Sequence, residues 1–125
     1  MATILLVEDE ASIRKLYAFE LRERGHEVLC ADNGIDAVAM AKQHTPDLVI
    51  MDLNLPDKMD GMESMSRILG ENADMPVIIN TGYSEYKDNF MSWAAEAYVL
   101  KSADVAPLID AVEEVLGRKS TGSGE

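Results

Sequence analysis

Short apolar segments alternate along the chain with longer segments in which apolar residues recur at helical spacing. The short runs are residues 4–7, 28–31, 48–51, 77–79 and 98–100. Most of these runs are apolar at nearly every position, which is typical of parallel strands that are buried on both faces. The pattern therefore predicts five strands, most of them inside the protein.

The segments between these runs predict five helices. Asp32-Asn33-Gly34 forms a turn before the second helix, while Gly70 and Gly117 are expected to end the third and the last. The fourth helix has the weakest pattern and is expected within residues 86–95, and the last begins near Asp104. Strands that alternate with helices at this spacing predict an α/β fold, with a parallel sheet covered by helices on both faces.

Length and composition indicate a single acidic domain. The chain has 125 residues, of which 47% are hydrophobic, and a domain usually needs roughly 100–200 residues. We expect a domain over residues 1–118, and we expect the small polar residues 119–125 to form a flexible tail or linker stub. The single cysteine, Cys30, excludes a disulfide framework and a cysteine-rich metal site.

Net charge and hydropathy indicate which classes of partner the protein is not expected to bind. The chain carries 11 basic and 23 acidic residues, a formal charge of −12, which disfavours direct nucleic-acid binding. The first residues lack the basic region of a signal peptide. No stretch approaches the ~20 apolar residues of a membrane span. We therefore expect a cytoplasmic protein without a membrane partner.

Polar residues follow the predicted strands at their carboxyl ends, where open parallel sheets bind ligands. They are Glu8, Asp9 and Glu10 after the first run, Asp52 after the third, Asn80, Thr81 and Gly82 after the fourth, and Lys101 after the fifth. Each alone has a structural explanation, such as a helix-capping acid, a turn residue or a solvated lysine. Together they place carboxylates, a hydroxyl and an ammonium group around one edge of the sheet.

This combination suits phosphoryl transfer. Crowded carboxylates repel one another, and a hard divalent cation such as Mg²⁺ removes the conflict. A carboxylate beside the cation can attack phosphorus and become an aspartyl phosphate. Lys101 can neutralise the transferring phosphoryl group from the other side, and Thr81 can donate a hydrogen bond to it.

Five short motifs share their order and spacing with a known family. They are ILLVEDE at residues 4–10, DLVIMDLNLP at 47–56, MDG at 59–61, NTG at 80–82 and YVLK at 98–101. In these motifs, and from about Thr3 to Gly117, the chain resembles the receiver domain of two-component response regulators, especially single-domain, chemotaxis-regulator-like members. The resemblance implies a flavodoxin-like doubly wound sheet with strand order 2-1-3-4-5.

The resemblance also implies a phosphorylation site and a metal site. Asp52 would accept phosphate from a phosphohistidine on a histidine kinase or a histidine phosphotransfer protein. Glu8, Asp9 and Asp52 would hold Mg²⁺ directly or through water, and the backbone carbonyl of Asn54 would be a further ligand.

A conformational switch is implied as well. Thr81 resembles the switch hydroxyl, Lys101 the phosphate-binding lysine and Tyr98 the switch aromatic. The output surface for a downstream effector protein or domain would comprise the fourth helix, the fifth strand and the fifth helix, which are residues 86–95, 98–101 and 104–116.

Two features depart from the family pattern. Two residues, Asp57 and Lys58, separate Pro56 from Met59, where the family usually has one. Lys101 is followed by Ser102 instead of the usual proline, which often has a cis bond. A non-proline cis bond costs about 3–4 kcal/mol, so we expect either a trans bond with a shifted loop or a strained cis bond.

The leading hypothesis is a phosphoacceptor in a His-to-Asp phosphorelay, not an enzyme, that assists its own phosphorylation and dephosphorylation. One alternative is a Mg²⁺-dependent phosphohydrolase with an aspartyl-phosphate intermediate, but Asn54 stands where such haloacid-dehalogenase-like enzymes usually have a second aspartate. Another is a flavin or nucleotide module, which the acidic pair and the lack of a glycine-rich phosphate loop disfavour. The last is an unphosphorylated interaction module, against which the complete residue set argues.

Overall fold

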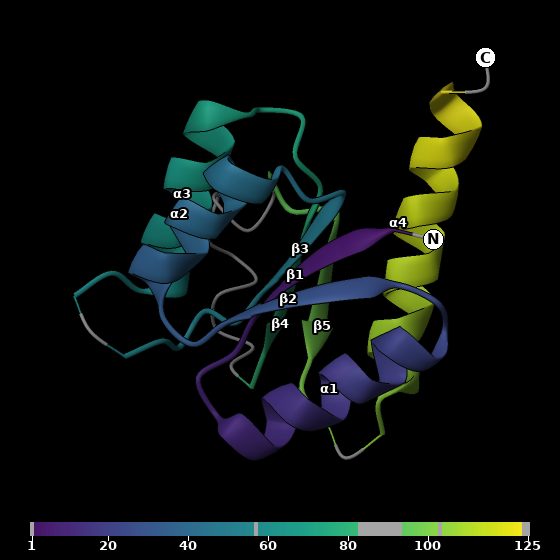
Figure 1. Ribbon diagram of the computed structural model, residues 1–125, viewed down its shortest axis with the longest axis horizontal. Coiled ribbons are helices and arrows are strands. Elements are labelled where there is room, and N and C mark those ends of the chain that lie inside the picture. Colours follow the sequence, from purple (N-terminus) through teal and green to yellow (C-terminus); the bar gives the residue numbers. More distant parts are fainter. Residues whose placement is uncertain (1, 57, 83–93, 103, 124–125) are drawn as a thin grey trace.

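A five-stranded parallel sheet forms the centre of the structure, a computed structural model that describes residues 2–56, 58–82, 94–102 and 104–123 (Figure 1). The strands are β1 (Thr3–Val7), β2 (Glu27–Ala31), β3 (Leu48–Met51), β4 (Val77–Thr81) and β5 (Ala97–Leu100). Their order is β2-β1-β3-β4-β5, and every neighbouring pair is parallel. The five predicted strands and the expected 2-1-3-4-5 order are confirmed.

Helices cover both faces of this sheet. They are α1 (Ala11–Glu23), α2 (Gly34–His44), α3 (Gly61–Glu71) and α4 (Ala106–Ser123). Helices α1 and α4 lie on one face, and α2 and α3 lie on the other (Figure 1). The described part of the chain therefore contains four helices. The additional helix expected within residues 86–95 falls largely on residues 86–93, outside the described residues, and stays a prediction.

Alternate side chains along a strand pack into two separate hydrophobic cores, one on each face of the sheet. In β1, Ile4 and Leu6 pack against apolar residues of α1 and α4, while Leu5 and Val7 pack against those of α2 and α3. All four side chains are at most 1% exposed. A strand buried on both faces has no solvated side, which explains why the sequence shows continuous apolar runs instead of alternation.

Two predicted helix ends are wrong. Helix α3 passes Gly70 and ends at Glu71, and α4 passes Gly117 and continues to Ser123. A glycine inside a helix costs only about 1 kcal/mol relative to alanine, so the backbone hydrogen bonds of a helix can continue through it. The predicted domain boundary at residue 118 stays a prediction.

The longest helix, α4, has 18 residues and carries the exposed acids Asp110, Glu113 and Glu114. Across the described residues, no helix is both long enough and apolar enough to cross a membrane. The expected cytoplasmic location stays a prediction.

Candidate functional site

The carboxyl ends of the central strands bring the predicted site residues together. The sheet's hydrogen bonding extends past the strands, because the Glu8 N–H donates to the carbonyl of Ala31 (3.0 Å) and the Asp52 N–H to that of Val7 (3.1 Å). The Lys101 N–H likewise donates to the Thr81 carbonyl (2.8 Å). The backbones of Glu8, Asp52 and Lys101 are therefore fixed by the sheet.

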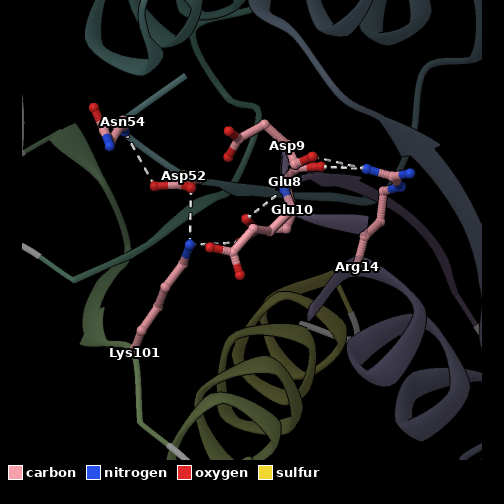
Figure 2. A network of polar contacts seen from close by, with 7 residues as sticks. All are labelled: Glu8, Asp9, Glu10, Arg14, Asp52, Asn54 and Lys101. Atoms are coloured by element: carbon pink, nitrogen blue, oxygen red, sulfur yellow. Dashed lines mark hydrogen bonds and ion pairs between the residues drawn. The ribbon is translucent and has the colours of Figure 1, made fainter. Parts of the chain in front are cut away.

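Three carboxylates meet at this edge (Figure 2). Glu8, Asp9 and Asp52 each offer one oxygen, and these oxygens all lie within 4.8 Å of one another. Glu8 and Asp52 are 1% and 3% exposed, whereas Asp9 is exposed. Hard carboxylate oxygens at this spacing are ligands that Mg²⁺ prefers, so the donor set fits the expected ion.

Lys101 reaches the same carboxylates from the end of β5. Its Nζ lies 2.7 Å from Glu8 Oε1 and 2.9 Å from Asp52 Oδ2. The other oxygen of Asp52, Oδ1, accepts a hydrogen bond from the Asn54 N–H at 3.1 Å. Both oxygens of Asp52 thus have a donor, and the carboxylate has a fixed orientation.

Burial and charge shift the pKa values of the paired groups. Burial raises the pKa of Glu8 above 4.5, the hydrogen bond from Lys101 opposes this, and the nearby Asp52 charge adds to the rise. Burial lowers the pKa of Lys101, but hydrogen bonds to Glu8 and Asp52 more than compensate, and the net result is a raised pKa. Lys101 therefore stays an ammonium group in the physiological range.

A cavity of about 380 Å³ opens onto this cluster. Asp9, Asp52, Asn54 and Lys101 are among its lining residues. A small molecule or a partner side chain that enters the cavity can therefore reach the carboxylate of Asp52. The backbone carbonyl of Asn54 as a metal ligand stays a prediction.

Thr81 ends β4 beside this cluster. It is fully buried, and its hydroxyl has no hydrogen-bond partner among the described residues. A buried hydroxyl without a partner costs about 1–3 kcal/mol. The expected switch aromatic, Tyr98, is partly buried and packs against the core on the α2–α3 face. The switching roles of Thr81 and Tyr98 stay predictions.

Two loops near the site contain the two departures from the family pattern, and the structure describes one of these departures fully. The Lys101–Ser102 bond is trans, since the described residues contain no cis peptide bond. Asp57, one of the two residues between Pro56 and Met59, lies outside the described residues.

Arg14 is a residue that the sequence analysis missed. Its Nη1 donates to the backbone carbonyl of Glu8 at 2.9 Å and to that of Asp9 at 3.4 Å (Figure 2). The sequence offers one indication that Arg14 has a specific contact, because the helix dipole disfavours a cation in the first turn of a helix. Such a residue needs a local acceptor.

Comparison with known proteins places these features in a family. The sequence model described as the response regulator receiver domain matches residues 4–113. The transcriptional regulatory protein PdtaR of Mycobacterium tuberculosis is 36% identical over 118 residues, which are 92% of this chain and 57% of PdtaR. The virulence transcriptional regulatory protein PhoP of Salmonella typhimurium is 30% identical, over 96% of this chain and 54% of PhoP. The chain thus spans about half the length of these curated relatives.

Solved structures show the same similarity. The response regulator TrrA of Thermotoga maritima, crystallised with Mg²⁺ and BeF, has a TM-score of 0.86 and 38% identity, over 91% of this chain and 98% of TrrA. TrrA has also been solved in complex with the histidine kinase ThkA, with a TM-score of 0.85 and 38% identity, over 93% of this chain and 99% of TrrA. A CheY-like receiver domain of Methanospirillum hungatei has a TM-score of 0.90 and 26% identity, over 98% of each chain.

Proposed function

Because the chain belongs to the response regulator receiver-domain family, we propose that Asp52 is its phosphoacceptor in a histidine-to-aspartate phosphorelay. The observation that carries this assignment is the surroundings of Asp52. Its carboxylate contacts Lys101 at 2.9 Å, lies within 4.8 Å of acidic oxygens of Glu8 and Asp9, and lines the open cavity. These are the surroundings that a carboxylate nucleophile for phosphorus requires.

Glu8, Asp9 and Asp52 are proposed to hold one Mg²⁺, with the Asn54 carbonyl as a further ligand. When bound, the ion supplies positive charge that offsets the negative oxygens of the nucleophile and of the phosphoryl group. The crowding of three carboxylates within 4.8 Å supports this proposal, as does the crystallisation of TrrA with Mg²⁺ and BeF.

The transfer itself uses groups of this chain. An oxygen of Asp52 forms a bond to phosphorus as the phosphorus–nitrogen bond of the donor phosphohistidine breaks, and the electron pair leaves with the imidazole. Lys101, held as an ammonium group, offsets charge on the phosphoryl oxygens. The Thr81 hydroxyl, which has no hydrogen-bond partner among the described residues, would gain an acceptor in a phosphoryl oxygen.

That gain is the proposed origin of the switch. A hydrogen bond formed only with the phosphoryl group would favour one conformation over another that exists beforehand. We assign Tyr98 the role of the responding aromatic, and β5 with α4, together with the helix expected in residues 86–95, the role of output surface. The response is read by an effector protein or domain.

The partners follow from this scheme. The proposed donor is a histidine kinase or a histidine phosphotransfer protein in the cytoplasm, and TrrA's complex with the kinase ThkA supports that class. The formal charge of −12 supports the proposal that the chain itself does not bind nucleic acid. We further propose that the chain assists its own phosphorylation and dephosphorylation without being a turnover enzyme.

Incubation with acetyl phosphate tests this function. Intact-mass spectrometry should show one added phosphoryl group with Mg²⁺ and none with EDTA. Asp52→Asn should abolish the addition, whereas Asp110→Asn, which removes an exposed acid of α4, should leave it unchanged. Phosphate that persists on Asp52→Asn would refute the site, and steady release of many phosphates per chain would indicate a phosphohydrolase.

A further inference from the structure

The loop between β1 and α1 carries two of the proposed Mg²⁺ ligands, and they are fixed in different ways. The Glu8 side chain is held by Lys101 at 2.7 Å and by the Glu10 N–H at 3.2 Å. The carboxylate of Asp9 is exposed and accepts no hydrogen bond from any described residue. The direction in which the Asp9 carboxylate points therefore depends on the backbone of its loop.

Arg14 holds that backbone. Its Nη1 donates to the carbonyls of Glu8 and Asp9, and its own N–H donates to the carbonyl of Glu10 at 2.9 Å. One residue thus contacts the backbone of three consecutive loop residues. Arg14 and Lys101 lie on opposite sides of this loop, so the guanidinium stays away from the face where the carboxylates converge (Figure 2).

The position of Arg14 in α1 does not favour the helix. It lies in the first turn, where the helix dipole disfavours a cation. The N-cap residue, Glu10, makes no side-chain capping hydrogen bond in the described part of the chain, and the first turn of α1 contains no acid to pair with Arg14. The loop carbonyls are the acceptors that hold the guanidinium there.

We propose that Arg14 is a positioning residue for the Mg²⁺ site, which aims the carboxylate of Asp9 by fixing the backbone of Glu8 and Asp9. The inference rests on the proposed function, because it needs Mg²⁺ to bind at Glu8, Asp9 and Asp52. Groups that orient metal ligands without touching the metal commonly contribute about tenfold or more to metal affinity.

The charge of Arg14 allows its positioning role to be distinguished from its direct electrostatic effect on Mg²⁺ binding. A positive charge beside a cation site repels the cation, so its removal alone would tighten Mg²⁺ binding. Loss of a positioning contact would weaken binding instead. The two explanations therefore predict changes of opposite sign for the same substitution.

The test is a Mg²⁺ titration of the full chain followed by backbone amide NMR, with Arg14→Gln, Arg14→Lys and the control Lys15→Gln. Lys15 is the exposed next residue of α1, so its substitution removes the same charge nearby without touching the loop. We expect Arg14→Gln to weaken Mg²⁺ binding about tenfold, Arg14→Lys to lie between it and the wild type, and Lys15→Gln to bind at least as tightly as the wild type.

Melting temperatures in EDTA report stability separately from metal affinity. Wild-type or tighter Mg²⁺ binding by Arg14→Gln would overturn the inference and leave the proposed function intact. If Arg14→Gln does not fold, Arg14→Lys decides, and wild-type affinity in that variant would overturn the inference. A wild-type chain that binds no Mg²⁺ would refute the metal site in the proposed function, and the role of Arg14 with it.

Discussion

At the scale of single residues, Lys101 is the group on which the proposed site depends. Its side chain is 21% exposed, while the side chains of Glu8 and Asp52 that it contacts are almost fully buried. This one ammonium group compensates the negative charge of two buried carboxylates. Removal of one member of a buried ionic group typically costs 3–5 kcal/mol, because the other charges stay buried without compensation.

Lys101→Met should therefore destabilise the fold by about 3 kcal/mol in urea unfolding with EDTA. Adding Asp52→Asn should recover part of this loss, because one of the two uncompensated carboxylates is then neutral. The control Arg24→Met breaks a surface pair with Glu20 and should cost less than about 1 kcal/mol. Equal stability of Lys101→Met and the wild type would show that Lys101 does not compensate the carboxylates.

The raised pKa of Glu8 gives a prediction about pH. A carboxyl group whose folded pKa exceeds its unfolded value contributes stability at low pH and loses it as the pH rises through the folded pKa. For Glu8 that loss begins near its ordinary pKa of 4.5. Glu8→Gln lacks this ionisation, so its stability relative to the wild type should rise from pH 4.5 to neutrality.

Urea unfolding at several pH values in EDTA measures this difference. Glu114→Gln, which removes an exposed acid of α4, is the matched control for the loss of one carboxyl group. A difference between Glu8→Gln and the wild type that stays constant or falls with pH would contradict the assigned pKa direction.

At this scale the sequence predicted which residues meet, but not how they pair. Asp52 and Lys101 follow strands whose carboxyl ends share one sheet edge, so their proximity follows from topology. Lys101 contacts both Glu8 and Asp52, and Arg14 Nη1 contacts two loop carbonyls. Both arrangements depend on side-chain conformations that only the packed structure determines. No periodicity in the sequence encodes them.

At the scale of elements, the start of α3 determines where the segment after Asp52 lies. The Gly61 N–H donates to the Leu53 carbonyl at 3.1 Å. A Cβ atom at Gly61 would collide with the carbonyl oxygen of Asp52 and the Cα of Leu53. The helix can therefore approach the backbone of the proposed phosphoacceptor this closely only because residue 61 has no side chain.

Gly61→Ala should destabilise the protein by about 1–3 kcal/mol and slow phosphorylation by acetyl phosphate, because the backbone at Asp52 must shift. At Gly70 in the same helix, an added Cβ would meet no described atom within 4 Å beyond the neighbouring helix backbone, so Gly70→Ala should stabilise the protein by about 1 kcal/mol. Urea unfolding of both variants measures these effects. A Gly61→Ala variant as stable as the wild type would show that this packing is not required.

Gly70 and Gly117 show why the sequence analysis misplaced two helix ends. Gly70 lies inside α3 and Gly117 inside α4, and among the described residues neither has a tertiary contact that requires a glycine. A glycine that ends a helix and one that the helix merely tolerates look alike in sequence. The two-sided burial of the strands was predicted correctly, because continuous apolar runs have a direct physical cause.

At the scale of the whole molecule, the proposed metal site links segments far apart in the chain. Glu8 and Asp9 follow β1, Asp52 follows β3, and the unfolded chain cannot hold them together. A ligand that binds only the folded state raises stability by mass action, by about 2.7 kcal/mol at one hundred times its dissociation constant. Saturating Mg²⁺ should therefore stabilise the fold.

The melting temperature of the wild type should rise with Mg²⁺, as measured by circular dichroism. Asp9→Asn should lose most of this rise, because it removes a carboxylate of the site, and Asp110→Asn should keep it. A rise of the same size in Asp9→Asn and the wild type would place Mg²⁺ elsewhere on this acidic chain.

The most direct test of the central claim is to locate the phosphoryl group chemically. The chain is phosphorylated with acetyl phosphate and Mg²⁺ and then treated with borohydride, which reduces an aspartyl phosphate to homoserine. Peptide mass spectrometry should find homoserine at residue 52 and at no other aspartate. Homoserine at another position, or at none while phosphate is incorporated, would contradict the assignment of Asp52 as the phosphoacceptor.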